Sequence, residues 1–237
     1  MKTIIVTGAS SGIGRATAEL FLAAGWRVGL IARRADRLDD MARRHESAVA
    51  LPADVTDPAA MQRAFDRFAD SAGRLDVLFN NAGMFGPAAP VDEVPLAAFD
   101  QVVAVNLRGM FIAARLAFGQ MRRQVPRGGR IINNGSVSAH VPRENTICYT
   151  ATKHAVTGLT RSLSLDGRPF DIACGQIDIG NAESEIVAEL KAVRPGMPTM
   201  AVKDAARSVL HMADMPLEAN VQFMTVMATK MPYIGRG

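Results

Sequence analysis

The sequence lacks most of the features that mark specialised classes of protein. Of its 237 residues only Cys148 and Cys174 are cysteines, too few and too isolated for a disulfide framework, a CxxC redox pair or a zinc site. Aromatic residues make up 5%, and no proline-rich, serine-rich or single-sign tract interrupts the chain, which argues against a disordered tail or linker. We therefore expect a cytoplasmic protein without a bound metal.

The chain also shows little that indicates secretion, a membrane or a nucleic acid. We find no apolar run long enough to span a bilayer, and the chain opens directly into a strand and a glycine turn, which leaves no room for a signal peptide. The formal charge is +4, but Lys and Arg are spread along the chain rather than clustered with aromatic residues. We expect neither a membrane nor a nucleic acid as partner, and a basic balance suits a phosphorylated anionic cofactor.

Short β-rich runs alternate with longer helical patterns along a chain that is long enough to form one large α/β domain, residues 1–237. The runs cover 3–6, 27–31, 48–51, 77–79, 130–133, 172–177 and 221–226, and the helical patterns cover 14–24, 34–45, 58–72, 96–123, 148–166 and 203–213. This alternation predicts right-handed βαβ units, and hence a single Rossmann-like, doubly wound α/β domain with a seven-stranded parallel sheet flanked by helices.

A glycine-rich turn, Thr7-Gly8-Ala9-Ser10-Ser11-Gly12-Ile13-Gly14, joins the first strand to the first helix. Glycines allow the backbone to turn sharply, while free N–H groups and the positive end of the helix attract a pyrophosphate. Such a turn can also be a mere connection, but its place in an alternating βα chain is the context that a dinucleotide site requires. The residues expected to bind the cofactor here are Gly8, Ser10, Ser11, Gly12, Ile13 and Gly14.

The end of the second strand indicates which dinucleotide binds. An acidic side chain there bonds the 2′-hydroxyl of the adenosine ribose, whereas arginine accommodates a 2′-phosphate. The strand ends in Ala32-Arg33-Arg34 without a carboxylate, and a guanidinium can bind phosphate through two hydrogen bonds. We therefore predict NADP, bound through Arg33 and Arg34; the alternative is that both arginines form a solvated helix start.

Tyr149 and Lys153 lie four positions apart in a predicted helix, so their side chains share one face. The ordinary pKa of tyrosine is near 10, and bringing it close to neutrality requires roughly 4 kcal/mol. An ammonium ~4 to 5 Å away, at an effective dielectric constant near 20, supplies roughly 3 to 4 kcal/mol. The pair can therefore serve as an acid/base unit, although in isolation a surface pair with a snorkelling lysine is the more common explanation.

Together these motifs resemble the short-chain dehydrogenase/reductase family in its single-domain form. The turn has the family's TGxxxGxG spacing, Tyr149 and Lys153 match its YxxxK motif, and Ser136 precedes Tyr149 by the family's thirteen positions. The resemblance implies hydride transfer between NADP(H) and a carbonyl or secondary alcohol. Ser136 would bond the substrate carbonyl, Tyr149 would exchange its proton, and Lys153 would also bind the nicotinamide ribose.

The resemblance assigns further site residues. Asn106 corresponds to a fourth catalytic residue that helps to hold a proton-relaying water at Lys153; a helix-bend or capping residue is the alternative. Asp54, followed by Val55, matches an aspartate at the adenine, with a turn residue as alternative. Asn80-Asn81-Ala82-Gly83 matches the family's NNAG motif, which adds Asn80, Ala82 and Gly83 as cofactor contacts. The family's usual Pro-Gly-x-Val-x-Thr segment corresponds to residues 179–184, where its sequence is altered. By this correspondence Ile179, Ala182 and Ser184 are expected near the nicotinamide.

Several nearby residues receive no chemical role. Cys148 has no base partner and is expected to pack, and His140 and His154 fit no metal or triad spacing, although His140 could line the pocket. Asp178 is unusually polar for a central strand, and the pattern offers no account of it. Residues 184–199 are expected to form a short substrate lid, and residues 231–237 lack the family's glycine-pair ending.

Two other functions stay open. A catalytically silent NADP-binding regulatory protein of the same fold would need no proton relay, so the intact Ser, Tyr, Lys and Asn set argues against it. An epimerase or dehydratase similar to the family's larger relatives would require a longer C-terminal substrate domain than the residues after Ala213 provide. The resemblance also implies a small-molecule carbonyl or alcohol substrate and a homo-oligomer, either a dimer or a tetramer.

Overall fold

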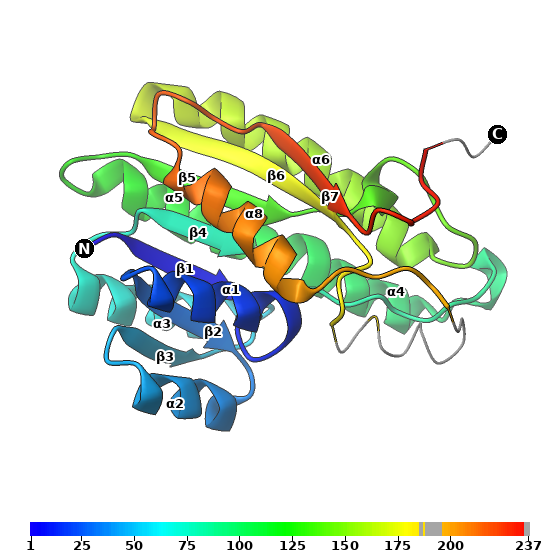
Figure 1. Cartoon of the computed structure of the whole chain (residues 1–237), viewed down its shortest axis with the longest axis horizontal. Helices are drawn as coiled ribbons and strands as arrows, with labels where there is room; N and C mark the ends of the chain where they lie inside the picture. Colours follow the sequence, from blue (N-terminus) through cyan, green and yellow to red (C-terminus); the bar gives the residue numbers. More distant parts are fainter. Residues whose placement is uncertain (185–186, 188–195, 235–237) are drawn as a thin grey trace.

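A computed structural model describes residues 1–184, 187 and 196–234. In this part of the chain, seven parallel strands form one sheet, whose arrangement Figure 1 shows. The strands are β1 (Thr3–Thr7), β2 (Arg27–Ala32), β3 (Ala48–Pro52), β4 (Val77–Asn80), β5 (Gly129–Asn134), β6 (Ile172–Gly180) and β7 (Phe223–Met227). Their order is β3-β2-β1-β4-β5-β6-β7, so the chain winds outward in both directions from the β1/β4 junction. The predicted fold class is confirmed, and the strand limits differ from the predicted ones by at most three residues.

Helices cover both faces of the sheet (Figure 1). One apolar core unites the sheet with α1 (Gly12–Ala23), α2 (Ala35–Arg44) and α8 (Val202–Asp214). The other unites it with α3 (Pro58–Ala72), α5 (Met110–Arg123) and α6 (Ile147–Gly167), and α4 (Leu96–Val103) precedes α5. Within β1, Ile4 and Val6 belong to the first core and Ile5 to the second, because successive side chains point to opposite faces. This is why the strands are continuous apolar runs.

The helix α3 has the limits predicted from the sequence because its end signals are local. The carboxylate of Asp57 accepts hydrogen bonds from the backbone N–H groups of Ala59 and Ala60, at 2.9 and 3.1 Å, and Pro58 occupies the first turn. Gly73 ends the helix with a φ of +75°, the left-handed conformation that glycine adopts without strain.

The segment Leu96–Arg123 is long and apolar enough to cross a membrane by length and composition, so our expectation that no run passes this test was wrong. It contains α4, a π-helical segment (Ala104–Gly109) and α5. Val102, Met110, Ala113 and Met121 on this segment are buried within the fold. A helix that packs on a parallel sheet carries enough apolar residues to meet the same criterion.

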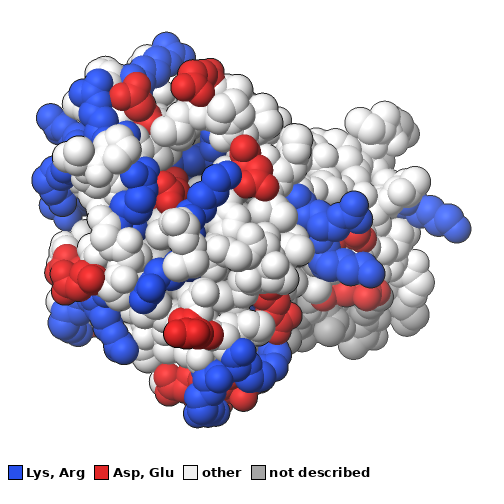
Figure 2. Space-filling view, turned by 60° about the vertical axis from the view of Figure 1, so that its left-hand side comes forward, with Lys and Arg blue, Asp and Glu red and all other residues white. Residues whose placement is uncertain are grey.

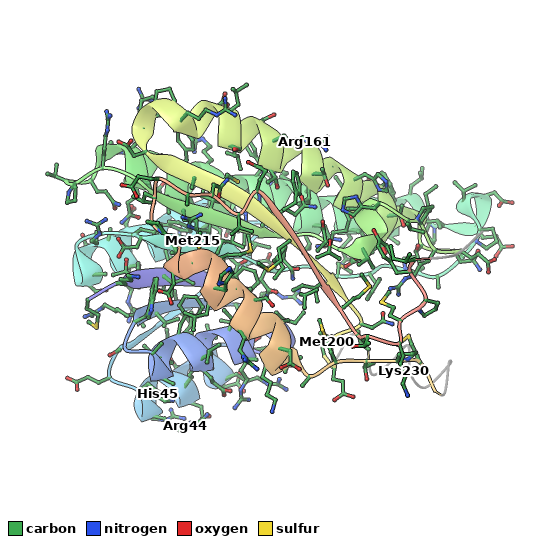
Figure 3. All side chains as sticks on the ribbon, turned by 45° about the horizontal axis from the view of Figure 1, so that its top comes forward. Arg44, His45, Arg161, Met200, Met215 and Lys230 are labelled. Atoms are coloured by element: carbon green, nitrogen blue, oxygen red, sulfur yellow. The ribbon has the colours of Figure 1, made fainter. Side chains whose placement is uncertain are left out.

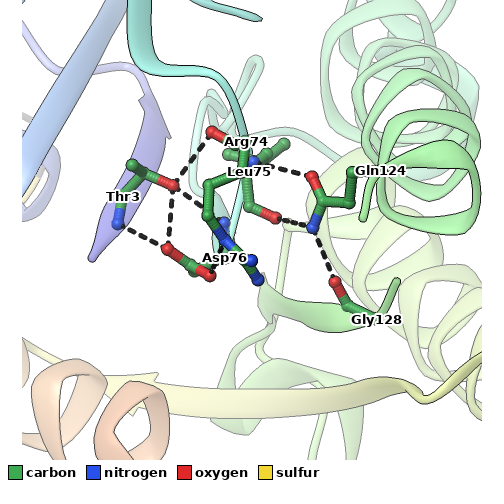
Figure 4. A network of polar contacts seen from close by, with 6 residues as sticks. All are labelled: Thr3, Arg74, Leu75, Asp76, Gln124 and Gly128. Carbon is green, nitrogen blue, oxygen red and sulfur yellow. Dashed lines mark hydrogen bonds and ion pairs between the residues drawn. The ribbon is translucent and has the colours of Figure 1, made fainter. Parts of the chain in front are cut away.

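Polar side chains tie the amino-terminal ends of the strands together (Figure 4). The Asp76 carboxylate accepts hydrogen bonds from the N–H and hydroxyl of Thr3, at 2.8 and 3.1 Å. The Gln124 side chain accepts from Leu75 N and donates to the carbonyls of Leu75 and Gly128. These bonds fix β1, β4 and the approach to β5, at the end of the sheet opposite to the carboxyl ends.

The helix α8 is anchored at both of its ends, which Met200 and Met215 flank (Figure 3). Met200 forms a parallel bridge with Ala182, just after β6. The carbonyl of Met215 accepts a hydrogen bond from Arg130 Nη2 at 3.1 Å, and Arg130 is 2% exposed. Met200, just before α8, is thus held beside the carboxyl end of β6.

Candidate active site

The carboxyl ends of the strands open into a cavity of about 500 Å³. It lies across the β1/β4 junction, the point where doubly wound sheets bind their ligands. The predicted residues on its wall are Gly8, Ser10, Ser11, Gly12, Ile13, Arg33, Arg34, Asp54, Val55, Ala82, Gly83, Ser136, Tyr149, Lys153, Ile179, Ala182 and Ser184.

The glycine turn presents bare backbone to this cavity. Gly8 and Gly12 have φ values of +70° and +52°, which strain any residue with a side chain. A Cβ at Gly8 would lie 3.0 Å from Asn81 Nδ2 and 3.1 Å from Ala82 Cα. The first turn of α1 holds no acidic side chain, so the helix end is free to attract an anion. These features fit the pyrophosphate of a dinucleotide.

Two arginines line the cavity at the end of β2. Arg33 is exposed, whereas Arg34 is partly buried and donates from Nε and Nη2 to Ser10 Oγ, at 3.1 and 3.0 Å. Arg34 thereby ties the start of α2 to the glycine turn and holds its charge beside it. Across the molecular face in Figure 2, Lys and Arg lie interspersed with Asp and Glu rather than forming one uninterrupted basic surface.

Asp54 stands after β3 on the same wall. Burial acts to raise the pKa of its carboxyl, but hydrogen bonds from the N–H and hydroxyl of Thr56, at 2.9 and 2.8 Å, and the charge of Arg33 lower it to below the usual value. Both bonds use Oδ1. Asp54 is therefore a well-fixed anion. It is both a turn residue, which was the alternative interpretation, and part of the cavity wall.

Ser136, Tyr149 and Lys153 meet at the other end of the cavity. Ser136 follows β5, where its Oγ accepts a hydrogen bond from Ser138 N at 3.1 Å. Tyr149 and Lys153 project from α6: Lys153 Nζ donates to the Asn134 carbonyl at 2.7 Å and lies 5.4 Å from the centre of the Tyr149 ring. Phe85 packs on the Tyr149 ring, with centroids 4.2 Å apart. The three side chains therefore stand together on one part of the cavity wall.

A model of the family described as short chain dehydrogenase matches residues 2–194. The chain belongs to the short-chain dehydrogenase family. The resemblance drawn from its motifs is confirmed, and the chain is an oxidoreductase with a nucleotide-binding Rossmann fold.

Curated relatives and solved structures agree with this family assignment. The chain is 37% identical to the 2-(R)-hydroxypropyl-CoM dehydrogenase of Xanthobacter autotrophicus over 77% of this chain and 75% of that one. It is 31% identical to the levodione reductase of Leifsonia aquatica, over 86% and 78%. A 3-ketoacyl-(acyl-carrier-protein) reductase from Brucella melitensis, complexed with NADH, superimposes with a TM-score of 0.89 at 25% identity, over 95% and 96%. A serine dehydrogenase with NADP⁺ shares the fold, with a TM-score of 0.92 at 21% identity over 99% and 98%.

Three residues that we predicted for the dehydrogenase site do not line the cavity. Gly14 packs inside the turn, because a Cβ there would lie 2.3 Å from the Gly8 carbonyl oxygen. Asn80 is buried and donates to the Met110 carbonyl at 2.7 Å. The Asn106 side chain, fully buried in the π-helical segment, accepts from Met84 N and donates to Met84 O, both at 2.8 Å. All three support the wall from behind.

Other wall residues were missed by the sequence analysis. Asn81 lines the cavity in place of Asn80, and it is fixed by bonds between Asn81 N and Thr7 Oγ1 and between Asn81 Nδ2 and Thr7 O. The NNAG motif contains Asn81 without indicating which of its two asparagines faces the cavity. Wall residues outside the motifs assigned from the sequence include Met84, Phe85, Gln101, Val105, Ser138, Arg143, Asn181 and Val187.

Of the remaining expectations around the site, one needs correction and another lies partly outside the described residues. His140 is not on the cavity wall; its Nε2 lies 2.8 Å from Oδ2 of Asp178. Of the expected lid, residues 185–186 and 188–195 lie outside the described residues, as do residues 235–237 at the end of the chain. Among the residues that the structure describes, no group of His, Cys, Asp or Glu could hold a metal.

The charges around Tyr149 differ from the sequence expectation. Burial raises the pKa of the Tyr149 hydroxyl above its ordinary value, and Asp178 adds to this, while a hydrogen bond with Ser136 and the charge of Arg143 act to lower it. Burial also lowers the pKa of Lys153 to about 8, against the opposing charge of Asp178. Lys153 is only 3% exposed, and burying its charged ammonium lowers the stability of the folded protein. The helix spacing alone could not reveal this burial.

Proposed function

We propose that this dehydrogenase transfers a hydride between NADP(H) and a small carbonyl or secondary alcohol, with Tyr149 as general acid and base. One observation carries the proposal: Ser136, Tyr149 and Lys153 share the wall of a single cavity with the bare glycine turn. Pyrophosphate would lie at Gly8 and Gly12, and the adenosine end near Asp54. NADP would supply the hydride chemistry.

The chain's own residues would handle the oxygen and its proton. In reduction, the hydroxyls of Ser136 and Tyr149 would donate hydrogen bonds to the substrate carbonyl oxygen, where negative charge develops. Tyr149 would then give its proton to that oxygen. Lys153 Nζ, fixed by the Asn134 carbonyl, would place a positive charge beside the tyrosinate that forms. Oxidation of the alcohol would reverse these steps.

The preference for NADP over NAD is supported by the end of β2. Arg33 and Arg34 stand on the wall there, and Ser10 adds a hydroxyl between Arg34 and the turn. A carboxylate, which would repel a 2′-phosphate, is missing at this strand end in the sequence. We further propose that the protein works in the cytoplasm as a homo-oligomer; exposed apolar side chains on the α4–α5 segment, Leu96 at 81% and Phe111 at 51%, are consistent with self-association.

Activity with NADPH and NADH on a panel of aldehydes and ketones tests the proposal. Tyr149→Phe should lower kcat at least 100-fold, since general acid catalysis contributes roughly that much, without weakening NADPH binding. Tight NADPH binding with no turnover of any substrate would refute the oxidoreductase reaction and favour a regulatory protein.

Arg33→Ala tests the cofactor preference. Loss of a charge-assisted bond should reduce the NADPH-over-NADH ratio of kcat/KM roughly 10- to 100-fold. Arg43→Ala is the matched control, because Arg43 is an exposed arginine on α2 that pairs with Asp40 away from the cavity. An unchanged ratio in Arg33→Ala would refute the assignment of NADP to this site.

A further inference from the structure

Asp178 is a buried carboxylate directly behind the catalytic serine. It lies in β6, is 1% exposed, and uses both oxygens. Oδ1 accepts from Ser136 N at 2.9 Å and from Gln176 Nε2 at 2.7 Å, and Oδ2 lies 2.8 Å from His140 Nε2. The carboxylate therefore joins the backbone of Ser136 to a histidine on the surface.

The space for this carboxylate exists only because residue 135 is glycine. A Cβ on Gly135 would lie 2.1 Å from Asp178 Oδ1 and 2.7 Å from Gln176 Nε2. Gly135 N also donates to the Ile177 carbonyl at 2.8 Å, which holds the start of the Ser136 turn against β6. Gly135 and Asp178 are thus a matched pair, and Ser136 is positioned by the carboxylate that Gly135 admits.

Through His140, the buried carboxylate of Asp178 has a neighbour that is exposed to solvent. The side chain of His140 is 40% exposed, against 1% for Asp178, so the imidazole can exchange protons with water while the carboxylate cannot. Histidine is the side chain whose charge ordinarily changes near neutral pH. A proton on His140 would compensate the negative charge of Asp178 without moving it.

The groups that would respond are the two on α6. The charge of Asp178 acts on both Tyr149 and Lys153, raising the pKa of each, and Arg143 opposes it at Tyr149. On the β7 side the register partner of Asp178 is the neutral Thr225. A proton on His140 would weaken the effect of Asp178, so the pKa of the Tyr149 hydroxyl would be raised less than by the carboxylate alone.

We infer that Asp178 is a positioning residue that fixes Ser136 for catalysis, and that His140 makes its electrostatic influence on the active site depend on pH. This inference rests on the proposed function and adds to it a pair of residues outside the cavity wall. It also accounts for the polar Asp178 in a central strand, which the sequence pattern left unexplained.

Asp178→Asn and His140→Gln test the inference through pH profiles of kcat/KM between pH 5 and 10. Asparagine can still accept from Ser136 N, so the fold and the serine position should persist while the charge is lost. Glutamine at 140 can still donate to Asp178 but does not titrate. The matched control is His154→Gln, since His154 is an exposed histidine on the same helix as Tyr149, and its Nδ1 lies 2.9 Å from the Thr150 carbonyl oxygen of that helix.

His140→Gln should remove one inflection from the profile and leave kcat/KM at pH 8.5 within about two-fold of the wild type. His154→Gln should leave the profile unchanged. Asp178→Asn should lose the same inflection and shift the alkaline limb to lower pH by roughly half a unit, in proportion to a charge acting at a distance. A His140→Gln profile that matches the wild type would overturn the inference, even if Asp178→Asn fails to fold.

A second readout does not depend on turnover. The chain has only two tyrosines, Tyr149 and Tyr233, so in a Tyr233→Phe background the ultraviolet absorbance of tyrosinate reports Tyr149 alone. Asp178→Asn should lower the midpoint of that titration, because a negative charge near the phenol is removed. An unmoved midpoint would overturn the electrostatic role. A moved midpoint in a protein that reduces no substrate would support the inference while refuting the proposed reaction.

Discussion

Burial of the Lys153 ammonium should make the free energy of unfolding depend on pH in a defined window. Lysine ordinarily keeps its proton up to a pKa of 10.5, whereas burial lowers the pKa of Lys153 in the folded protein to about 8. Between these values the unfolded chain binds more protons than the folded one. The free energy of unfolding therefore rises with pH across that window. The destabilisation caused by the buried ammonium is fully present below pH 8.

The size of the effect follows from the pKa difference. The gap corresponds to roughly 3 kcal/mol in total at 1.36 kcal/mol per unit, of which about 2 kcal/mol should appear between pH 7 and pH 9.5. Other buried groups titrate in the same range: burial raises the pKa of the Cys174 thiol from 9.0 to about 12, so its contribution to stability is lost as pH rises above 9. In the wild type alone, the effects of Lys153 and Cys174 on the free energy of unfolding would oppose each other.

Comparison of the wild type with Lys153→Met separates them. Both proteins carry Cys174 and Tyr149, so the difference between their free energies of unfolding isolates Lys153; the Asn134 carbonyl that loses its donor adds only a constant. Urea denaturation followed by circular dichroism should show the wild type gaining about 2 kcal/mol over Lys153→Met from pH 7 to pH 9.5. Lys203→Met, at an exposed site on α8, should show no such gain. A difference that stays constant within about 0.5 kcal/mol would refute the reasoning.

Two glycines and one arginine should respond in different directions to substitution. Gly14→Ala places a Cβ 2.3 Å from the Gly8 carbonyl oxygen, so we expect a lower melting temperature and weaker NADPH binding in fluorescence titrations; unchanged binding would contradict this. Gly158→Ala, exposed within α6 with no atom within 4 Å of the new methyl group, should instead raise the free energy of unfolding, measured by urea denaturation, by roughly 0.5 to 1 kcal/mol. Arg130→Met leaves the carbonyls of Met215, Pro216 and Ala219 without their donor, and should cost roughly 3 kcal/mol in the same assay; a loss below about 1 kcal/mol would show that they are not held by Arg130.

Local signals explain why so much of the fold could be predicted. The parallel sheet follows from apolar runs whose length and spacing suit strands covered on both faces, and the limits of α3 follow from Asp57, Pro58 and Gly73, which lie next to the residues they cap. The glycine turn and the Tyr149–Lys153 pair are equally local, since each depends on residues a few positions apart.

What could not be predicted depends on tertiary surroundings. Periodicity does not say which of two adjacent asparagines faces a cavity, so Asn80 was chosen where Asn81 lines it. Helix spacing placed Lys153 near Tyr149 but said nothing about how deeply the ammonium is buried, and burial dominates its pKa. Likewise, Leu96–Arg123 passes a membrane criterion because a helix on a parallel sheet and a membrane span draw on the same apolar residues.

Polar residues of β4, β5 and β6, linked through Thr160 of α6, form one connected chain that ends at the active site. Asn80 Nδ2 donates to Asn133 Oδ1 at 3.3 Å, and Asn133 Nδ2 to Thr160 Oγ1 at 3.0 Å. Thr160 Oγ1 donates to Gln176 Oε1 at 3.2 Å, and Gln176 Nε2 to Asp178 Oδ1 at 2.7 Å. A buried polar group costs stability unless it is hydrogen-bonded, so each of these residues taken alone would destabilise the core. Because they bond to one another, they offset this cost, and the carboxylate behind Ser136 is held by the sheet together with α6.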